Sequence, residues 1–136
     1  SFGISNTVPG IVAKGSGVLW MSIQTMYYPA TYNTWSNLTL QNSWVAYGDI
    51  FSTPQYTKAA DGLVTLKGLI KSGTATPGTI IASLPAGYRP SGRLLITGLS
   101  ANAYCRIDID INGNIIIQSG SNTWLSLDNI TFYADK

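Results

Sequence analysis

Short apolar runs separated by turn signals fill residues 54–96, and this rhythm constrains the fold more than any other feature of the chain. Turns or loops are expected at residues 60–62, 73–78 and 85–92, so the segments between them are only about 6–10 residues long. Between the first two turns, apolar and polar side chains alternate along the sequence, which is typical of a strand with one buried face. The pattern predicts an all-β sandwich or barrel without a long helix.

The same reasoning divides the whole chain into strands. We predict strands, single or paired, at residues 37–47, 56–59, 63–71, 79–84, 93–99 and 124–133, with a hairpin at 104–118.

The N-terminal region differs from this pattern. Residues 18–24 alternate but are apolar on both faces, which indicates a strand with two covered sides. Because the chain begins at Ser1 without Met, we expect it to be the excised end of a longer polypeptide. We therefore predict an arm or linker with one strand at residues 1–35, packing on or leading into a β-sandwich domain at residues 36–136.

Composition argues against several classes of function. The chain has 136 residues, enough for one domain with a sizeable core, and only 10% of them are charged. It has no His and no Glu, so the commonest general acid–base group and metal ligand is missing. The eight Lys and Arg residues are dispersed and give a net charge of only +2, so we expect no nucleic-acid partner.

Two further features limit the chemistry. Cys105 is the only cysteine, so no intrachain disulfide can form, and a buried apolar role accounts for it. No apolar run approaches the roughly 20 residues of a membrane-spanning helix, so we expect no membrane insertion.

The hairpin at residues 104–118 allows a prediction of register. Asn112-Gly113 lies between Ile-rich runs, which is a strong hairpin signal. A two-residue loop would place Asp110 opposite Ile115. A three-residue loop with Gly113 in the left-handed conformation pairs Asp110 with Asn114 and gives one wholly apolar face. We predict the three-residue loop.

The opposite face of this hairpin carries polar side chains and one isoleucine. They are Arg106, Asp108, Asp110, Asn114, Ile116 and Gln118. Two carboxylates spaced two residues apart on a strand lie about 6.5–7 Å apart, a distance that suits an inverting glycosidase. However, nothing nearby raises the pKa of either carboxyl group, and Arg106 would lower both. The pattern therefore favours a polar strand face over a catalytic pair, and it falls short of a Ca²⁺ loop. We expect no cofactor and no metal.

The aromatic side chains offer a different chemistry. A pyranose stacks its C–H face on an aromatic ring while Asp, Asn and Arg side chains bind its hydroxyl groups. Trp44 lies within a strand pattern and is expected in the core, whereas Trp35 and Trp124 each follow a polar loop. We predict that the saccharide-binding residues are Trp35, Tyr104, Arg106, Asp108, Asp110 and Trp124.

A family resemblance extends over residues 38–133. It rests on Asn42-Ser43-Trp44-Val45, Pro54-x-Tyr56-x-Lys58, Gly62-x-Val64-x-Leu66-x-Gly68-x-Ile70 and Leu84-Pro85-x-Gly87-Tyr88-Arg89-Pro90. In these elements the chain resembles the C-terminal head domains of bacteriophage tail-fibre and baseplate receptor-binding proteins. The resemblance implies an antiparallel, jelly-roll-like β-sandwich head that assembles as a homotrimer. It also implies that the matching residues form the framework and not the binding site.

The same resemblance implies a function. Such heads lie at the extracellular tip of the phage tail, join other tail or baseplate proteins through the upstream region, and bind host cell-surface saccharides such as wall polysaccharide or teichoic-acid-like polymers. The low charge, Ile116 and the two-faced strand at 18–24 agree with apolar surface that partner copies cover. The alternatives are a purely structural trimeric tip, a carbohydrate-binding module of a larger protein, and a depolymerase that uses the two Asp residues.

Overall fold

The computed structural model describes residues 34–135, and this part of the chain is built from antiparallel strands and contains no helix. The predicted all-β class is confirmed. The arm at 1–35, including the strand at 18–24, lies outside the described residues apart from its last two positions. The strands are β1 (Ser36–Asn37), β2 (Val45–Ala46), β3 (Gln55–Lys58), β4 (Leu63–Lys67), β5 (Leu69–Lys71), β6 (Thr79–Ser83), β7 (Leu94–Ser100), β8 (Ala103–Ile109), β9 (Asn114–Ser119), β10 (Leu125–Ser126) and β11 (Ile130–Tyr133).

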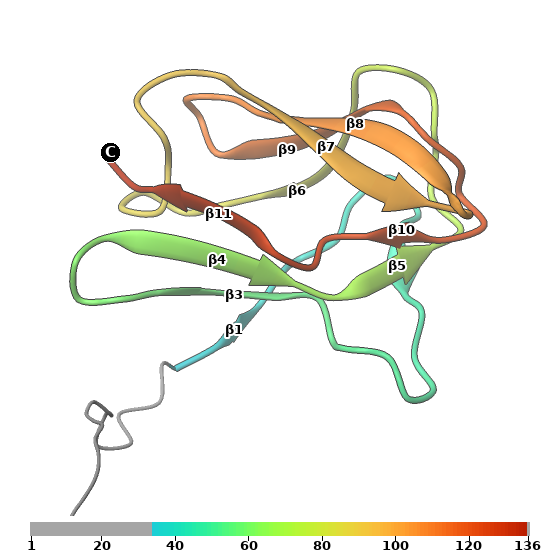
Figure 1. Ribbon diagram of the computed structural model, residues 1–136, viewed down its shortest axis with the longest axis horizontal. Helices are drawn as coiled ribbons and strands as arrows, with labels where there is room; N and C mark the ends of the chain where they lie inside the picture. Colours follow the sequence, from blue (N-terminus) through green and yellow to red (C-terminus); the bar gives the residue numbers. More distant parts are fainter. Residues whose placement is uncertain (1–33, 136) are drawn as a thin grey trace, which may run out of the picture. The chain divides into compact units, whose positions relative to one another are not determined.

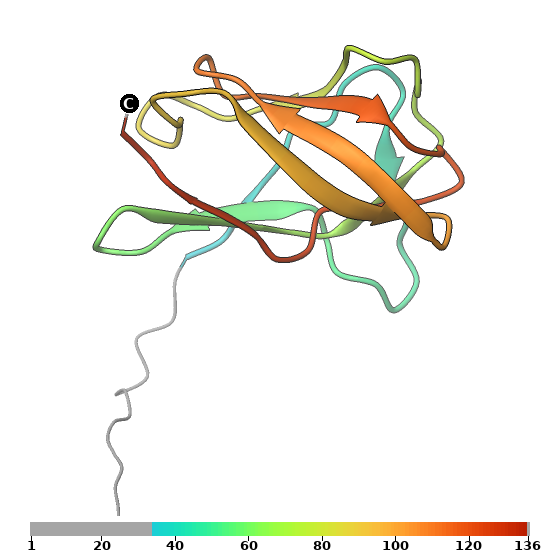
Figure 2. The ribbon, with the colours of Figure 1, turned by 45° about the horizontal axis from the view of Figure 1, so that its top comes forward.

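The strands form two sheets that pack face to face (Figure 1). The smaller sheet has the order β1-β3-β4-β11, and the larger one has the order β2-β5-β10-β7-β8-β9-β6. Figure 2 shows the long β7–β8 pair of the larger sheet crossing above the smaller sheet. The inner faces of both sheets supply one apolar core, to which the smaller sheet contributes Val64, Leu66 and Phe132, and the larger sheet Ile70, Ile107, Ile109, Ile115, Ile117 and Leu125.

The predicted strand at 63–71 is two strands in different sheets. β4 pairs with β3 and β11, and β5 pairs with β2 and β10, so the chain crosses between the sheets at Gly68. Gly68 has a φ of 125°, a conformation that residues with a Cβ rarely adopt. Its N–H donates to the Asp128 side chain and its C=O accepts the Leu127 N–H, so neither group belongs to the hydrogen-bond ladder of β4 or β5. Alternation alone cannot reveal such a bend because Leu66 and Ile70 stay buried on both sides of it.

The last strands repeat this crossing. β10 belongs to the larger sheet and β11 to the smaller one, and the chain passes between them at residues 127–129. The two crossings are hydrogen-bonded to each other: the Gly68 N–H donates to Asp128 Oδ1 at 2.7 Å, and the Leu127 N–H donates to the Gly68 carbonyl at 2.8 Å. The crossings therefore fix one corner of the sandwich.

The hairpin between β8 and β9 has the predicted three-residue loop. Ile107 lies opposite Ile117, Ile109 lies opposite Ile115, and the Asp110 N–H donates to the Asn114 carbonyl. Gly113 is left-handed, with a φ of 81°. The predicted apolar face is confirmed, because all four isoleucines are fully buried.

Two expectations need correction. Residues 37–47 are largely irregular, with only the two-residue strands β1 and β2, which belong to different sheets. Ile116 was also expected to be exposed until a partner copy covers it, but it is only 7% exposed within a single chain. It pairs with Asp108 across the sheet and with Ile80 of the neighbouring strand β6, so the sheet already covers its flanks.

Residues of the motif that carried the family resemblance contact one another. Lys58 Nζ donates to the Gly87 carbonyl at 2.7 Å and lies 4.8 Å from the centre of the Tyr88 ring. Tyr56 and Tyr88 meet edge to face at 5.1 Å, and Arg89 Nε donates to the Leu84 carbonyl. The corner at residues 84–90 is thereby tied to β3, in agreement with a framework role.

Candidate functional site

A hollow lies on the outer face of the larger sheet, beside the corner where the chain crosses between the sheets. In β5 and β10, Ile70 and Leu125 are fully buried, so their neighbours Leu69 and Ser126 point to the opposite, outer face. Leu69 and Ser126 are paired across the two strands, and the Tyr47 N–H donates to the Leu69 carbonyl. This row of residues forms the floor of the hollow.

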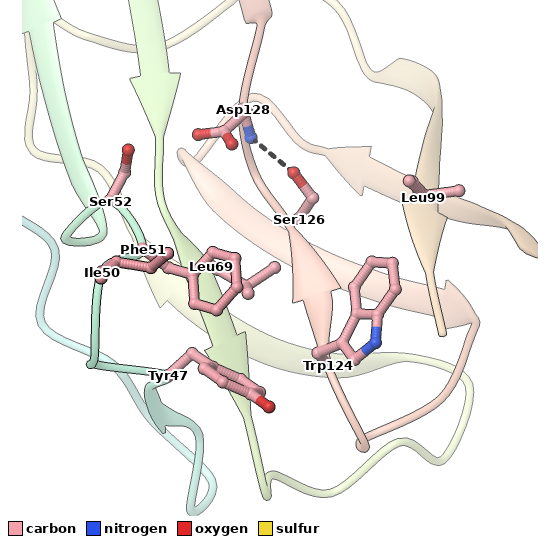
Figure 3. Close-up of a pocket in the computed structure, with 9 residues that line it drawn as sticks. All are labelled: Tyr47, Ile50, Phe51, Ser52, Leu69, Leu99, Trp124, Ser126 and Asp128. Carbon is pink, nitrogen blue, oxygen red and sulfur yellow. Dashed lines mark hydrogen bonds between the residues drawn. The ribbon is translucent and has the colours of Figure 1, made fainter. Parts of the chain in front are cut away.

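Aromatic side chains form its walls (Figure 3). The rings of Tyr47 and Phe51 meet edge to face at 5.1 Å, and the indole of Trp124 lies across the floor from them. The hollow encloses about 460 Å³, within the range of small-molecule sites. Its lining consists of Tyr47, Ile50, Phe51, Ser52, Leu69, Leu99, Trp124, Ser126 and Asp128.

Polar groups at one end of the hollow are positioned by the corner. One carboxylate oxygen of Asp128 accepts the Gly68 N–H, so the side chain is held, although the residue is exposed. The Asp128 N–H donates to Ser126 Oγ at 3.2 Å, which leaves the hydroxyl proton of Ser126 available to a ligand. The site therefore combines stacking surface with hydroxyl and carboxylate groups.

A second hollow of about 450 Å³ adjoins the first and shares Leu99, Ser126 and Asp128 with it. It lies where β7 diverges from β10, because these strands pair only at Leu125 and Ser100. Tyr104, which is 87% exposed, stands at its margin. The two hollows thus place Trp124 and Tyr104 in one region of the surface.

The other residues predicted for saccharide binding lie elsewhere. Trp35 belongs to the segment before β1, at the smaller sheet, and the Nζ atom of Lys67 lies 4.2 Å from the centre of its ring. Arg106, Asp108 and Asp110 lie on the outer face of the β8–β9 hairpin and line neither hollow. The six predicted residues therefore do not form one site.

Asp108 has a different environment from the one expected of an exposed strand face. The residue is fully buried, and its two carboxylate oxygens accept hydrogen bonds from Arg106 Nε at 2.9 Å, Arg106 Nη2 at 3.0 Å and Arg93 Nε at 3.0 Å. The arginine side chains remain about half exposed and cover it. The carboxylate therefore neutralises two arginines and presents no surface to a ligand.

Asp110 organises the hairpin loop. Its Oδ1 atom accepts the backbone N–H groups of Asn112 and Asn114, and its Oδ2 atom accepts the Asn114 side-chain amide. Such bonds from an Asp side chain to the backbone two residues on are typical of tight turns.

Neither carboxyl group is suited to general acid catalysis. Hydrogen bonds from Arg106 lower the pKa of Asp108 against the opposing effect of burial, and Arg93 lowers it further. For Asp110, burial raises the pKa, but hydrogen bonds from Asn114 and Asn112 and the charge of Arg93 outweigh it, so the net pKa is lowered. A general acid at neutral pH needs a raised pKa.

Sequence reasoning missed several residues that line the hollow: Tyr47, Phe51 and Asp128. The aromatic residues of the loop at 47–51, between turn signals, were the available signal. No sequence signal pointed to Asp128, because the position of its side chain depends on a hydrogen bond to a residue sixty positions away.

Residues 34–135 contain neither a cluster of metal-ligating side chains nor a membrane-spanning helix. This part of the chain contains no group of three or more His, Cys, Asp or Glu side chains that could hold a metal ion. It also has no helix long and apolar enough to cross a membrane.

Comparison with known proteins gives a structural match only. No protein-family model matches the chain, and no curated protein matches it either. Among solved structures, the chain is similar to the receptor binding protein (gp15) of Listeria phage PSA. The match has a TM-score of 0.60 and 23% sequence identity, and covers 77% of this chain and 67% of the phage protein. At this level of identity, the similarity shows that the two chains share a fold.

Proposed function

We propose that the protein is the head of a phage receptor-binding protein that attaches a virion to a bacterial cell-surface saccharide by non-catalytic binding. The observation that carries the proposal is the hollow between Trp124 and the Tyr47–Phe51 pair, with the hydroxyl of Ser126 and the carboxylate of Asp128 at one end. Aromatic walls with a few fixed polar groups suit a sugar ring. The fold shared with a phage receptor-binding protein supports the biological setting, extracellular and at the tail tip or baseplate.

A binding role accounts for the site better than catalysis does. The predicted carboxylate pair has lowered pKa values, and Asp108 is buried beneath two arginines. The hollow itself contains one carboxylate, whereas glycoside hydrolysis ordinarily uses two.

We also propose that the head is a homotrimer. The outer face of β7 and β8 exposes Leu95, Leu99 and Tyr104 by 64%, 47% and 87%. Leu99 pairs with Tyr104 across these strands, so the apolar side chains lie on one surface. A second copy there would cover them and would place the hollow close to a protomer boundary, and three copies would strengthen weak sugar binding through multivalency.

Substitution of Leu95 by Asp is expected to dissociate the trimer, because a carboxylate at the interface would lose its hydration without gaining a partner. Light scattering after size-exclusion chromatography would measure the mass, and Ile111→Asp, which also replaces an exposed apolar residue, serves as the control. A wild-type chain that is monomeric at micromolar concentration would contradict the trimer. If L95D keeps the trimer mass, the interface lies on another face.

Binding to bacterial cell walls tests the proposed function. The fluorescently labelled chain would be incubated with purified walls from a panel of strains, and Trp124→Ala is expected to weaken binding about tenfold because stacking area is lost. Trp35→Ala is the matched comparison, since it removes a half-buried tryptophan outside the hollow. If Trp35→Ala weakens binding and Trp124→Ala does not, the hollow is the wrong site. If no wall binds while the trimer persists, the chain is a structural tip.

A further inference from the structure

We infer that Asp128 determines the ligand specificity of the hollow: it selects uncharged sugar rings through their hydroxyl groups and rejects phosphate and other anionic groups. The inference rests on the proposed function and concerns the same hollow. It assigns a role to a residue whose side chain the fold holds in place through the Gly68 N–H.

The charges that line the hollow support this assignment. Among the nine lining residues, Asp128 carries the only formal charge, and none of them is Lys or Arg. A phosphate group in the hollow would meet a carboxylate without a compensating cation, which is unfavourable where water is partly displaced. Proteins that recognise phosphate ordinarily supply Arg, Lys or several backbone N–H groups.

Two cationic side chains of the described region, Lys71 and Arg106, contact groups other than Asp128. Lys71 Nζ lies 4.8 Å from the centre of the Tyr47 ring, and Lys71 does not belong to the lining. Arg106 directs two of its N–H groups at Asp108. Among the described residues, no Lys or Arg forms an ion pair with Asp128.

The hydrogen-bonding capacity at Asp128 matches a sugar. One of its carboxylate oxygens accepts the Gly68 N–H, and no described residue donates to the other oxygen. That oxygen can accept a hydrogen bond from a hydroxyl group of the ligand, and the neighbouring Ser126 hydroxyl can donate a hydrogen bond to a ligand oxygen. A pyranose stacked on the Trp124 indole presents hydroxyl groups at its edge, which can serve both residues.

The sign of the effect of Asp128→Asn on binding tests the inference. The asparagine side-chain oxygen can still accept the Gly68 N–H, so the corner is retained while the charge is removed. With walls that the wild-type chain binds, we expect D128N to weaken binding about tenfold, because charge-assisted hydrogen bonds to sugar hydroxyls are lost. A phosphate ligand would instead bind D128N more tightly, because the repulsion is removed.

Asp61→Asn is the matched control. Asp61 is also exposed, its Oδ1 atom accepts a backbone N–H, from Leu63 at 3.1 Å, and its substitution changes the net charge by the same amount. Equal effects of D61N and D128N would show that only the overall charge of the head matters, which would overturn the inference.

Salt dependence provides a second measurement that needs no variant. If the ligand group is uncharged, wild-type binding should change by less than about twofold between 0.05 and 0.5 M NaCl, because screening acts only between charges. A steep loss of binding with salt would indicate an anionic ligand and overturn the inference.

The two proposals can fail separately. Weaker binding by W124A combined with unchanged or tighter binding by D128N would leave the attachment function in place and remove the role of Asp128. Failure of every wall preparation to bind would remove the attachment function, and with it the ligand that Asp128 is inferred to select.

Discussion

Gly68→Ala is expected to lower the free energy of unfolding by about 3–5 kcal/mol, the sum of backbone strain and steric overlap. Gly68 has a φ of 125°, and a Cβ there would lie 2.6 Å from the Pro54 backbone nitrogen. Because backbone and not a flexible side chain blocks the position, the chain at the corner must shift. Thermal unfolding followed by circular dichroism should show a melting temperature at least about 12 °C lower.

Gly78→Ala separates the two causes of this loss. Gly78 also has a positive φ, of 93°, but a Cβ there would meet nothing within 4 Å. Gly78→Ala should therefore lower the free energy of unfolding only by the conformational strain, about 1–2 kcal/mol. If both alanine variants melt at the same temperature, the close approach of Pro54 to Gly68 contributes nothing to stability.

Asp108→Asn is expected to destabilise the head by about 2–3 kcal/mol, as estimated for the loss of charge-assisted hydrogen bonds at a buried group. The asparagine amide would turn donors toward Arg93 or Arg106, which have only donors to offer. Urea unfolding would measure the loss. Asp49→Asn, an exposed residue in a left-handed turn conformation that asparagine tolerates, is the control.

The same substitution should change the acid sensitivity of the protein. The pKa of Asp108 is lower in the folded state than in the unfolded chain, chiefly because of the hydrogen bonds from Arg106. Its stabilising contribution is therefore complete above the unfolded value of about 3.9 and is lost as the pH falls through the lower, folded value. Stability should decline more steeply below about pH 4 in the wild type than in D108N, and parallel profiles would contradict the role of this carboxylate.

Local sequence was sufficient to predict the β8–β9 hairpin. Asn112-Gly113 marked the turn, and the spacing of the isoleucines allowed only one register with an apolar face. Both signals act between residues that are close in the chain, where turn chemistry and alternation decide the pairing. The core position predicted for Trp44 is also confirmed, since it is only 2% exposed, although the strand from which it was predicted is largely irregular.

The division of strands between sheets could not be predicted in this way. Gly68 marks the end of β4 and the start of β5, yet the apolar alternation continues through it. The bend depends on partners from distant segments: Pro54 packs against Gly68, and Asp128 accepts its N–H. A glycine within a strand indicates that another part of the chain or a ligand packs closely against it, but the sequence does not identify which.

The candidate site shows the same limit. Trp124 and Tyr104 were predicted from their aromatic character and their surroundings, and they lie on adjoining hollows. Asp108 is a residue type that suits a sugar site. However, its carboxylate is covered by the side chain of Arg106 from the same strand and by that of Arg93 from the segment before β7. The contact with Arg106, two residues away on the same strand face, could be expected from the sequence, whereas the contact with Arg93 comes from another segment of the chain.

The amino-acid sequence by itself determined the all-β class and the register of the β8–β9 hairpin, because these depend on alternation and turn chemistry over short distances. Only the tertiary structure decided where the chain crosses between the sheets and which polar groups face a ligand. The crossings at Gly68 and Asp128 bring residues sixty positions apart into hydrogen-bonding contact, and this contact holds the carboxylate that lines the hollow.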